Sequence, residues 1–128
     1  MGVFSERIEV GSPDESRFEA IEAVVDTGAS FTTIPASMLR RLGATPHDRE
    51  VEVFVIADGS TIEREIGYTG LRVQGKSGIS PVVFGDEGVQ ALLGAFTLEV
   101  LQLGVDSGHQ RLAPVPAYLL AQVETYRR

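Results

Sequence analysis

One carboxylate in this sequence, Asp26, stands where an apolar run meets a turn. Val24 and Val25 precede it as β-branched residues typical of the end of a buried strand, and Thr27 and Gly28 follow it. Gly28 permits backbone angles or a close approach that a side chain would block. A carboxylate at the end of a buried strand is costly unless donors or water satisfy it, so its presence indicates an acid–base role.

Asp26 also has a simpler interpretation. An Asp before Thr-Gly is ordinary turn chemistry, and the residue could be a turn or helix-cap residue. The three-residue pattern alone is weak, because residue frequencies place it in a chain of this length on the order of a few per cent of the time. A second element is needed to decide between a catalytic and a structural carboxylate.

Residues 24–29 place two apolar residues before Asp, Thr, Gly and Ala, and this order resembles the motif of the retropepsin-like aspartic proteases. A second match, Leu92, Leu93 and Gly94, follows at the family's usual distance and precedes an expected helix over residues 96–103. In the family, this apolar-apolar-glycine strand threads the loop that carries the acid. The two matches in this order favour the catalytic interpretation.

The resemblance implies a role for each residue of the turn. Asp26 would be the catalytic acid, and the Thr27 hydroxyl would bond across a dimer axis. Gly28 would let the backbone approach both the partner and the peptide, while Ala29 and Ser30 would line the floor of the site. Ser30 is not expected to be a nucleophile, because neither a Gly-x-Ser-x-Gly elbow nor a plausible base lies near it in sequence.

Aspartic proteolysis needs two carboxylates that share a proton. One accepts a proton from the attacking water while the other donates to the carbonyl oxygen of the substrate. This chain contains Asp-Thr-Gly once. We therefore expect a symmetric homodimer with Asp26 of each protomer on the two-fold axis, and a peptide or protein as substrate.

A hairpin is predicted between the acid turn and the second matched element. Its turn contains Ala57, Asp58, Gly59 and Ser60, and Asp-Gly between two strand patterns is a strong local hairpin signal. In the resembled family, a glycine-containing hairpin at this position is the flap that closes over a bound peptide. Retroviral flaps are richer in glycine, whereas this tip has only Gly59 beside the charged Asp58. Any β protein has hairpins, so an ordinary hairpin remains the alternative.

Hydrophobic periodicity elsewhere predicts a mainly β chain with short helices. One helix is expected over residues 35–43, with Pro35 in its first position, Gly43 as its C-terminal cap, and Met38, Leu39 and Leu42 facing the core. The predicted strands are residues 3–10, 17–25, 31–34, 51–56, 61–66, 68–74, 79–84, 89–94 and 110–113, with a turn at 105–108 before the last.

The length of 128 residues predicts a single domain. The resemblance covers residues 17–113 and implies the closed β-barrel of the acid-protease fold, with the short helix after the Leu-Leu-Gly strand. Residues 114–128 are expected to be a C-terminal extension, in which the composition and apolar spacing of residues 116–126 predict a helix.

Composition excludes several other classes of protein. The absence of cysteine excludes disulfides, thiolate metal sites and a catalytic Cys, and it suits a cytoplasmic location. The net charge of −7 argues against nucleic-acid and anionic-membrane partners. No export signal or membrane-spanning run is present. His47 and His109 lack metal-ligand spacing, so we expect neither a metal nor a cofactor.

Two functions remain. The first is an aspartic endopeptidase that hydrolyses peptide bonds as a homodimer, with water activated by the paired Asp26 carboxylates. The alternative is a dimeric binding or scaffold module of the same fold that cleaves little or nothing. The charged hairpin tip and the unmatched residues 114–128 motivate this second interpretation.

Overall fold

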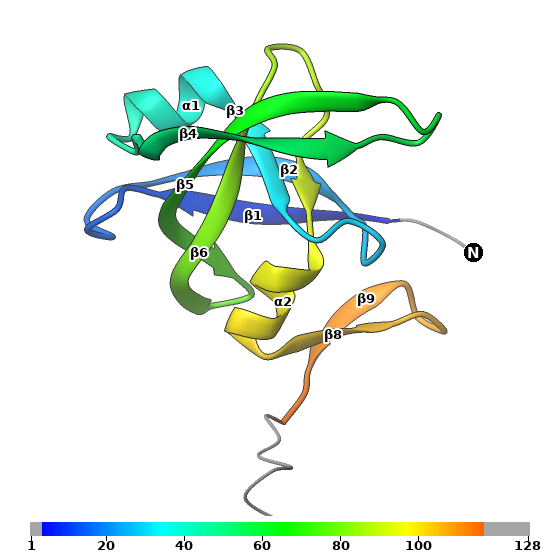
Figure 1. Cartoon of the computed structure of the whole chain (residues 1–128). Helices are drawn as coiled ribbons and strands as arrows, with labels where there is room; N and C mark the ends of the chain where they lie inside the picture. Colours follow the sequence, from blue (N-terminus) through cyan, green and yellow to red (C-terminus); the bar gives the residue numbers. More distant parts are fainter. Residues whose placement is uncertain (1–3, 117–128) are drawn as a thin grey trace, which may run out of the picture.

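Six strands of the computed structural model, which describes residues 4–116, close into a barrel (Figure 1). The pairing between β1 and β5, through Glu9 with Arg72 and Val10 with Leu71, completes the ring. A further strand, β4, pairs with β5 as a long hairpin. In order around the ring, the strands are β1 (Ser5–Gly11), β2 (Phe18–Val25), β7 (Leu92–Leu93), β3 (Thr32–Pro35), β6 (Lys76–Gly85) and β5 (Thr61–Val73); β4 spans Pro46–Val55.

Buried apolar side chains alternate with more exposed ones along the strands, and the buried ones fill the barrel interior. On β1, Ile8 and Val10 are fully buried, whereas their neighbours Arg7 and Glu9 lie toward solvent. On β2, Ala23 and Val25 are buried in the same way just before Asp26. The core therefore extends up to the acid turn, and the prediction of a mainly β closed barrel is confirmed.

Helix α1 (Ala36–Arg41) packs Met38 and Leu39 into the core, and Leu42, which follows it, is also buried. Gly43 comes next with a φ of 92°, as predicted for a C-terminal cap. Pro35 is the last residue of β3 and the N-cap, so its predicted place inside the first turn is wrong by one position.

Helix α2 (Ala95–Leu101) follows β7, as predicted, but ends earlier than residue 103. Gln102 adopts a left-handed conformation with a φ of 56°, which stops the helix. The chain then forms β8 (Leu103–Asp106), which pairs with β9 (Arg111–Pro114) in a separate two-stranded sheet. Residues 105–106, predicted as part of a turn, belong to this strand.

Strand β5 runs without a break through Gly67, where two strands were predicted. A β-carbon at Gly67 would lie 2.6 Å from the carbonyl oxygen of Thr45 and 2.9 Å from the Phe84 ring, so this glycine allows close packing and does not mark a turn. Strand β7 is only Leu92–Leu93, shorter than the predicted residues 89–94. The predicted C-terminal helix lies outside the described residues, among which no helix is long and apolar enough to cross a membrane.

Asp14, in the turn between β1 and β2, is predicted to make the stability of the fold depend on pH. Oδ1 of Asp14 accepts hydrogen bonds from the hydroxyls of Ser12 (2.7 Å) and Ser16 (2.8 Å), and these bonds lower its pKa to about 2. An unfolded Asp has a pKa of about 3.9. The unfolded chain therefore binds more protons between these values, and stability falls as the pH drops from about 4 toward 2.

Urea unfolding of the wild type and of Asp14→Asn between pH 2.5 and 6 tests this expectation. The wild type should be the more stable protein at pH 6, and its advantage should shrink as the pH falls below about 4. An advantage that stays constant across this range would contradict the assigned role of Asp14.

Candidate active site

Asp26 lies directly after β2, and three hydrogen bonds hold its turn. Its backbone N–H donates to the Leu93 carbonyl (3.0 Å), and the Gly28 N–H donates to Oδ1 of its carboxylate (2.9 Å). The Ala29 N–H donates to the Asp26 carbonyl (3.1 Å). Among the described side chains and the backbone of residues 4–116, Oδ2 of Asp26 has no hydrogen-bond partner, and the residue is half-buried. The carboxylate is thus oriented and keeps one oxygen for other contacts.

Strand β7 passes beneath this turn, parallel to β2 and antiparallel to β3. A β-carbon at Gly94 would lie 2.6 Å from both the carbonyl carbon and the oxygen of Phe31, and 2.9 Å from the Ala29 oxygen. The N–H groups of Ala95 and Phe96 donate to the carbonyls of Ala29 (2.8 Å) and Ser30 (2.9 Å). The backbone after β7 therefore supports the acid loop at a separation that only glycine allows.

Three buried hydroxyls fix the same segment from the barrel side. Thr32 Oγ1 accepts a hydrogen bond from the Gly94 N–H (3.0 Å) and lies 2.5 Å from Thr97 Oγ1. Thr97 in turn lies 2.8 Å from Ser80 Oγ. All three side chains are fully buried, so the network joins β3, β6 and α2 in a dry interior where each bond is costly to lose.

A cleft of about 970 Å³ lies between the acid turn and the β4–β5 hairpin. In Figure 1 this hairpin and the loop that follows β2 project to the same side of the barrel. Phe54 of the hairpin packs edge-on against Phe31 of the loop, with ring centroids 5.5 Å apart. The larger apolar side chains that line the cleft are Phe31, Val53, Phe54, Val55, Ile56, Ile62, Val83, Val89 and Leu92.

The hairpin turn is ordered by its own side chains. Asp58 Oδ1 accepts hydrogen bonds from the Ser60 hydroxyl (2.6 Å) and backbone N–H (2.9 Å), and these bonds lower the pKa of Asp58. Gly59 has a φ of 88°, which the turn requires. Of the four residues predicted for the flap tip, Ala57 lines the cleft. The charge of Asp58 is engaged within its own turn.

The model of the family described as "gag-polyprotein putative aspartyl protease" matches residues 18–100. This chain belongs to that family of retropepsin-like aspartyl proteases. The match includes the acid turn, the hairpin and β7, so the resemblance seen in the two sequence motifs is confirmed. No curated protein matches the sequence.

The retropepsin-like fold brings most of the predicted site residues together. Gly28, Ala29, Ser30 and Leu92 line the cleft with Asp26. Thr27 is exposed beside them, while Leu93 and Gly94 are buried under the turn. Strand β7 therefore lies between β2 and β3, the two strands that flank the acid loop.

Other cleft residues of this retropepsin-like domain carry no motif. Phe54 and Ile62 are cross-strand partners in the hairpin, so the strand alternation places both on the face that covers the acid. The pairing of Phe54 with Ile62 across the predicted hairpin was the sequence feature that could have identified both as cleft residues. Arg64 and Asp86 are brought together from different elements, and no local sequence pattern singles them out.

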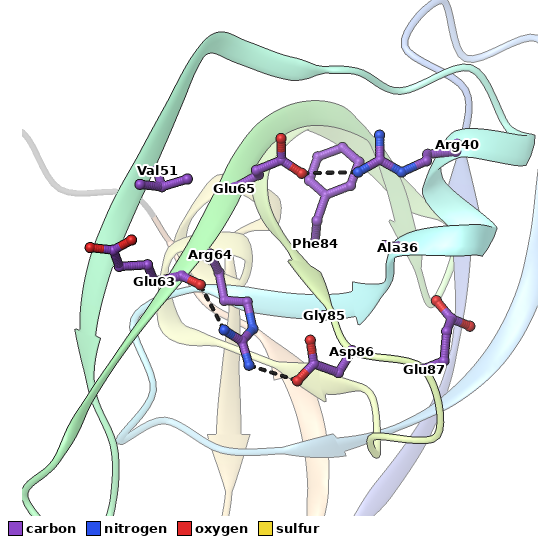
Figure 2. A pocket seen from close by; sticks show the side chains of 10 residues that line it. All are labelled: Ala36, Arg40, Val51, Glu63, Arg64, Glu65, Phe84, Gly85, Asp86 and Glu87. Atoms are coloured by element: carbon purple, nitrogen blue, oxygen red, sulfur yellow. Dashed lines mark hydrogen bonds and ion pairs between the residues drawn. The ribbon is translucent and has the colours of Figure 1, made fainter.

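A second hollow of about 430 Å³ adjoins the cleft and shares Arg64, Gly85 and Asp86 with it (Figure 2). Arg64 Nη2 lies 2.6 Å from Asp86 Oδ2, and Arg64 Nη1 donates to the carbonyl of Glu63 at 2.6 Å. On its far side, the Arg40 guanidinium pairs with Glu65 (2.9 Å). Among the side chains that the structure describes, those of residues 4–47 and 51–116, no three from His, Asp or Glu converge on a point that could hold a metal ion.

Thr32→Val is predicted to destabilise the retropepsin-like domain. The substitution keeps the volume of the side chain but leaves the Gly94 N–H without its acceptor in a dry interior, at a cost of about 1–3 kcal/mol in the free energy of unfolding. Urea denaturation measures this loss directly.

Thr32→Ser is the matched control, because it removes a methyl group and keeps the hydroxyl. It should lose about 1 kcal/mol, less than the valine variant. A valine variant as stable as the wild type would show that the hydroxyl does not support the segment under the acid turn.

Proposed function

We propose that this protein is an aspartic endopeptidase that acts as a homodimer. The observation that carries the proposal is the position of Asp26, which lies at the floor of a cleft under a hairpin with one carboxylate oxygen unbonded within the described chain. Family membership supports a protease fold.

Two Asp26 carboxylates, one from each protomer, share one proton in this proposal. Two like charges at close range do not both ionise, so the apparent pKa values of the pair split. The ionised carboxylate takes a proton from the attacking water, and the protonated one donates to the oxygen of the scissile carbonyl. A tetrahedral intermediate then collapses, the amine leaves with a proton, and no covalent bond to the protein forms.

In this proposal the second carboxylate comes from a second copy of the chain. Asp-Thr-Gly occurs once in the 128 residues, and a two-fold axis through the turn places its copy opposite. Thr27 is exposed next to Asp26, which leaves its hydroxyl accessible to the partner protomer. Its role is to keep the two turns in register.

An extended peptide is the substrate that the cleft favours. The apolar lining takes side chains that flank the scissile bond, and the hairpin and floor offer backbone groups for strand addition. The edge-on contact between Phe31 and Phe54 joins the acid loop to the hairpin at the cleft, so we expect the hairpin to lift when a substrate enters.

Asp26→Asn is predicted to lower peptide cleavage by about 10³-fold, because the variant can no longer exchange a proton with water. The fold should remain intact, since the Asn side-chain oxygen still accepts the bond from the Gly28 N–H. Mass spectrometry of a peptide library incubated with each protein from pH 4 to pH 7 measures the cuts.

Glu22→Gln is the control for loss of one exposed carboxylate on β2, and it should cut as the wild type does. Cleavage by the Asp26→Asn protein at the wild-type rate would refute the proposal. Peptide binding without cleavage at any pH by the wild type would favour the second candidate, a binding module of the same fold.

A further inference from the structure

The ion pair between Arg64 and Asp86 lies in the wall of the cleft, away from the hairpin tip. Arg64 is on β5, toward the base of the hairpin, and Asp86 follows β6. Both residues line the cleft and also the second hollow, which continues beyond them (Figure 2). A peptide that extends along the cleft from Asp26 toward the hairpin base meets this pair.

The two members of the pair differ in what they offer to a ligand. Arg64 is 28% exposed and is held twice, by Asp86 and by the carbonyl of Glu63. The Asp86 side chain is 61% exposed, and of its two carboxylate oxygens only Oδ2 has a hydrogen-bond partner among the described residues. The Arg64 guanidinium is therefore already hydrogen-bonded on both terminal nitrogens, whereas Oδ1 of Asp86 is available to a ligand.

The charge around this pair is negative. Glu52 is the cross-strand partner of Arg64 on β4, and it is exposed and lines the cleft. The hairpin-base end of the cleft, defined here as Glu52, Arg64 and Asp86, thus carries two carboxylates and one guanidinium. The adjoining hollow is lined by the exposed side chain of Val51 and by the buried ring of Phe84, whose centroid lies 5.1 Å from the Arg40 guanidinium carbon.

We propose that the hairpin-base end of the cleft is a subsite that selects substrates with a Lys or Arg side chain at a position removed from the scissile bond. The apolar stem of such a side chain packs toward the hollow, and its cationic head reaches the open oxygen of Asp86. Arg64 acts as a positioning residue, because one of its bonds is to the Glu63 carbonyl and the other holds Asp86 in the wall. The proposal rests on the cleft being the peptide site proposed above.

Three peptides that differ at one position, Lys, Gln or Glu, test this subsite, with the position scanned over three residues on each side of the scissile bond. At one position the wild type should cleave the Lys peptide about tenfold faster than the Glu peptide in kcat/KM, with Gln between them. Asp86→Asn should bring the Lys-to-Glu ratio close to one, because it leaves one carboxylate, Glu52, and one guanidinium, Arg64, at this end of the cleft.

Glu87→Gln is the matched control. Glu87 is the next residue, lines the hollow but not the cleft, and is bound to the backbone and hydroxyl of Ser37. Its substitution removes the same charge and should keep the wild-type ratio. Equal cleavage of the Lys and Glu peptides at every position, or an equal change of the ratio in both variants, would overturn the subsite.

Fluorescence anisotropy of the same peptides with the Asp26→Asn protein separates this proposal from that of proteolysis. Tighter binding of the Lys peptide with no cleavage by the wild type would refute proteolysis and support the subsite. Cleavage without a charge preference would refute the subsite alone. No binding of any of the peptides would refute the subsite together with the peptide cleft on which it rests.

Discussion

The candidate site depends on the close passage of the backbone at Gly94 under the acid loop. The α-carbon there lies so near Phe31 and Ala29 that any β-carbon would overlap their main-chain atoms. This passage lets β7 pair with β2 on one side and with β3 on the other, and it places the Leu93 carbonyl against the Asp26 N–H. The carboxylate therefore stands on a hydrogen-bonded floor.

That floor is continuous with the barrel core. The hydroxyls of Thr32, Thr97 and Ser80 link it to three elements, and the apolar side chains of β1 and β2 fill the space behind it. A rigid floor suits acid–base chemistry, because a carboxylate has to hold its geometry while the substrate changes. The hairpin is different: its tip is exposed and makes its polar side-chain contacts within its own turn.

Local patterns in the sequence predict the acid turn and the β7 segment that form the floor of the cleft. They do not predict the contacts between side chains that form its walls. Val24 to Gly28 and the Leu-Leu-Gly element are recognisable because a buried strand, a turn and a close approach each restrict residue type over a few positions. The contacts of Arg64 with Asp86 and of Phe31 with Phe54 join residues that are far apart in the chain. No short sequence pattern includes both partners of either contact. The end of α2 before Gln102 was also not predictable from the sequence, because the left-handed residue that ends a helix is usually glycine.

The central claim is that each protomer supplies half of an acid pair, and a subunit-mixing experiment tests it most directly. Equal amounts of wild-type and Asp26→Asn protein are unfolded together, refolded and assayed for peptide cleavage. Random pairing predicts about one quarter of the activity of the same total amount of wild type, because only pairs with two Asp26 side chains work. About one half of that activity would mean that a single chain is sufficient and would contradict the account.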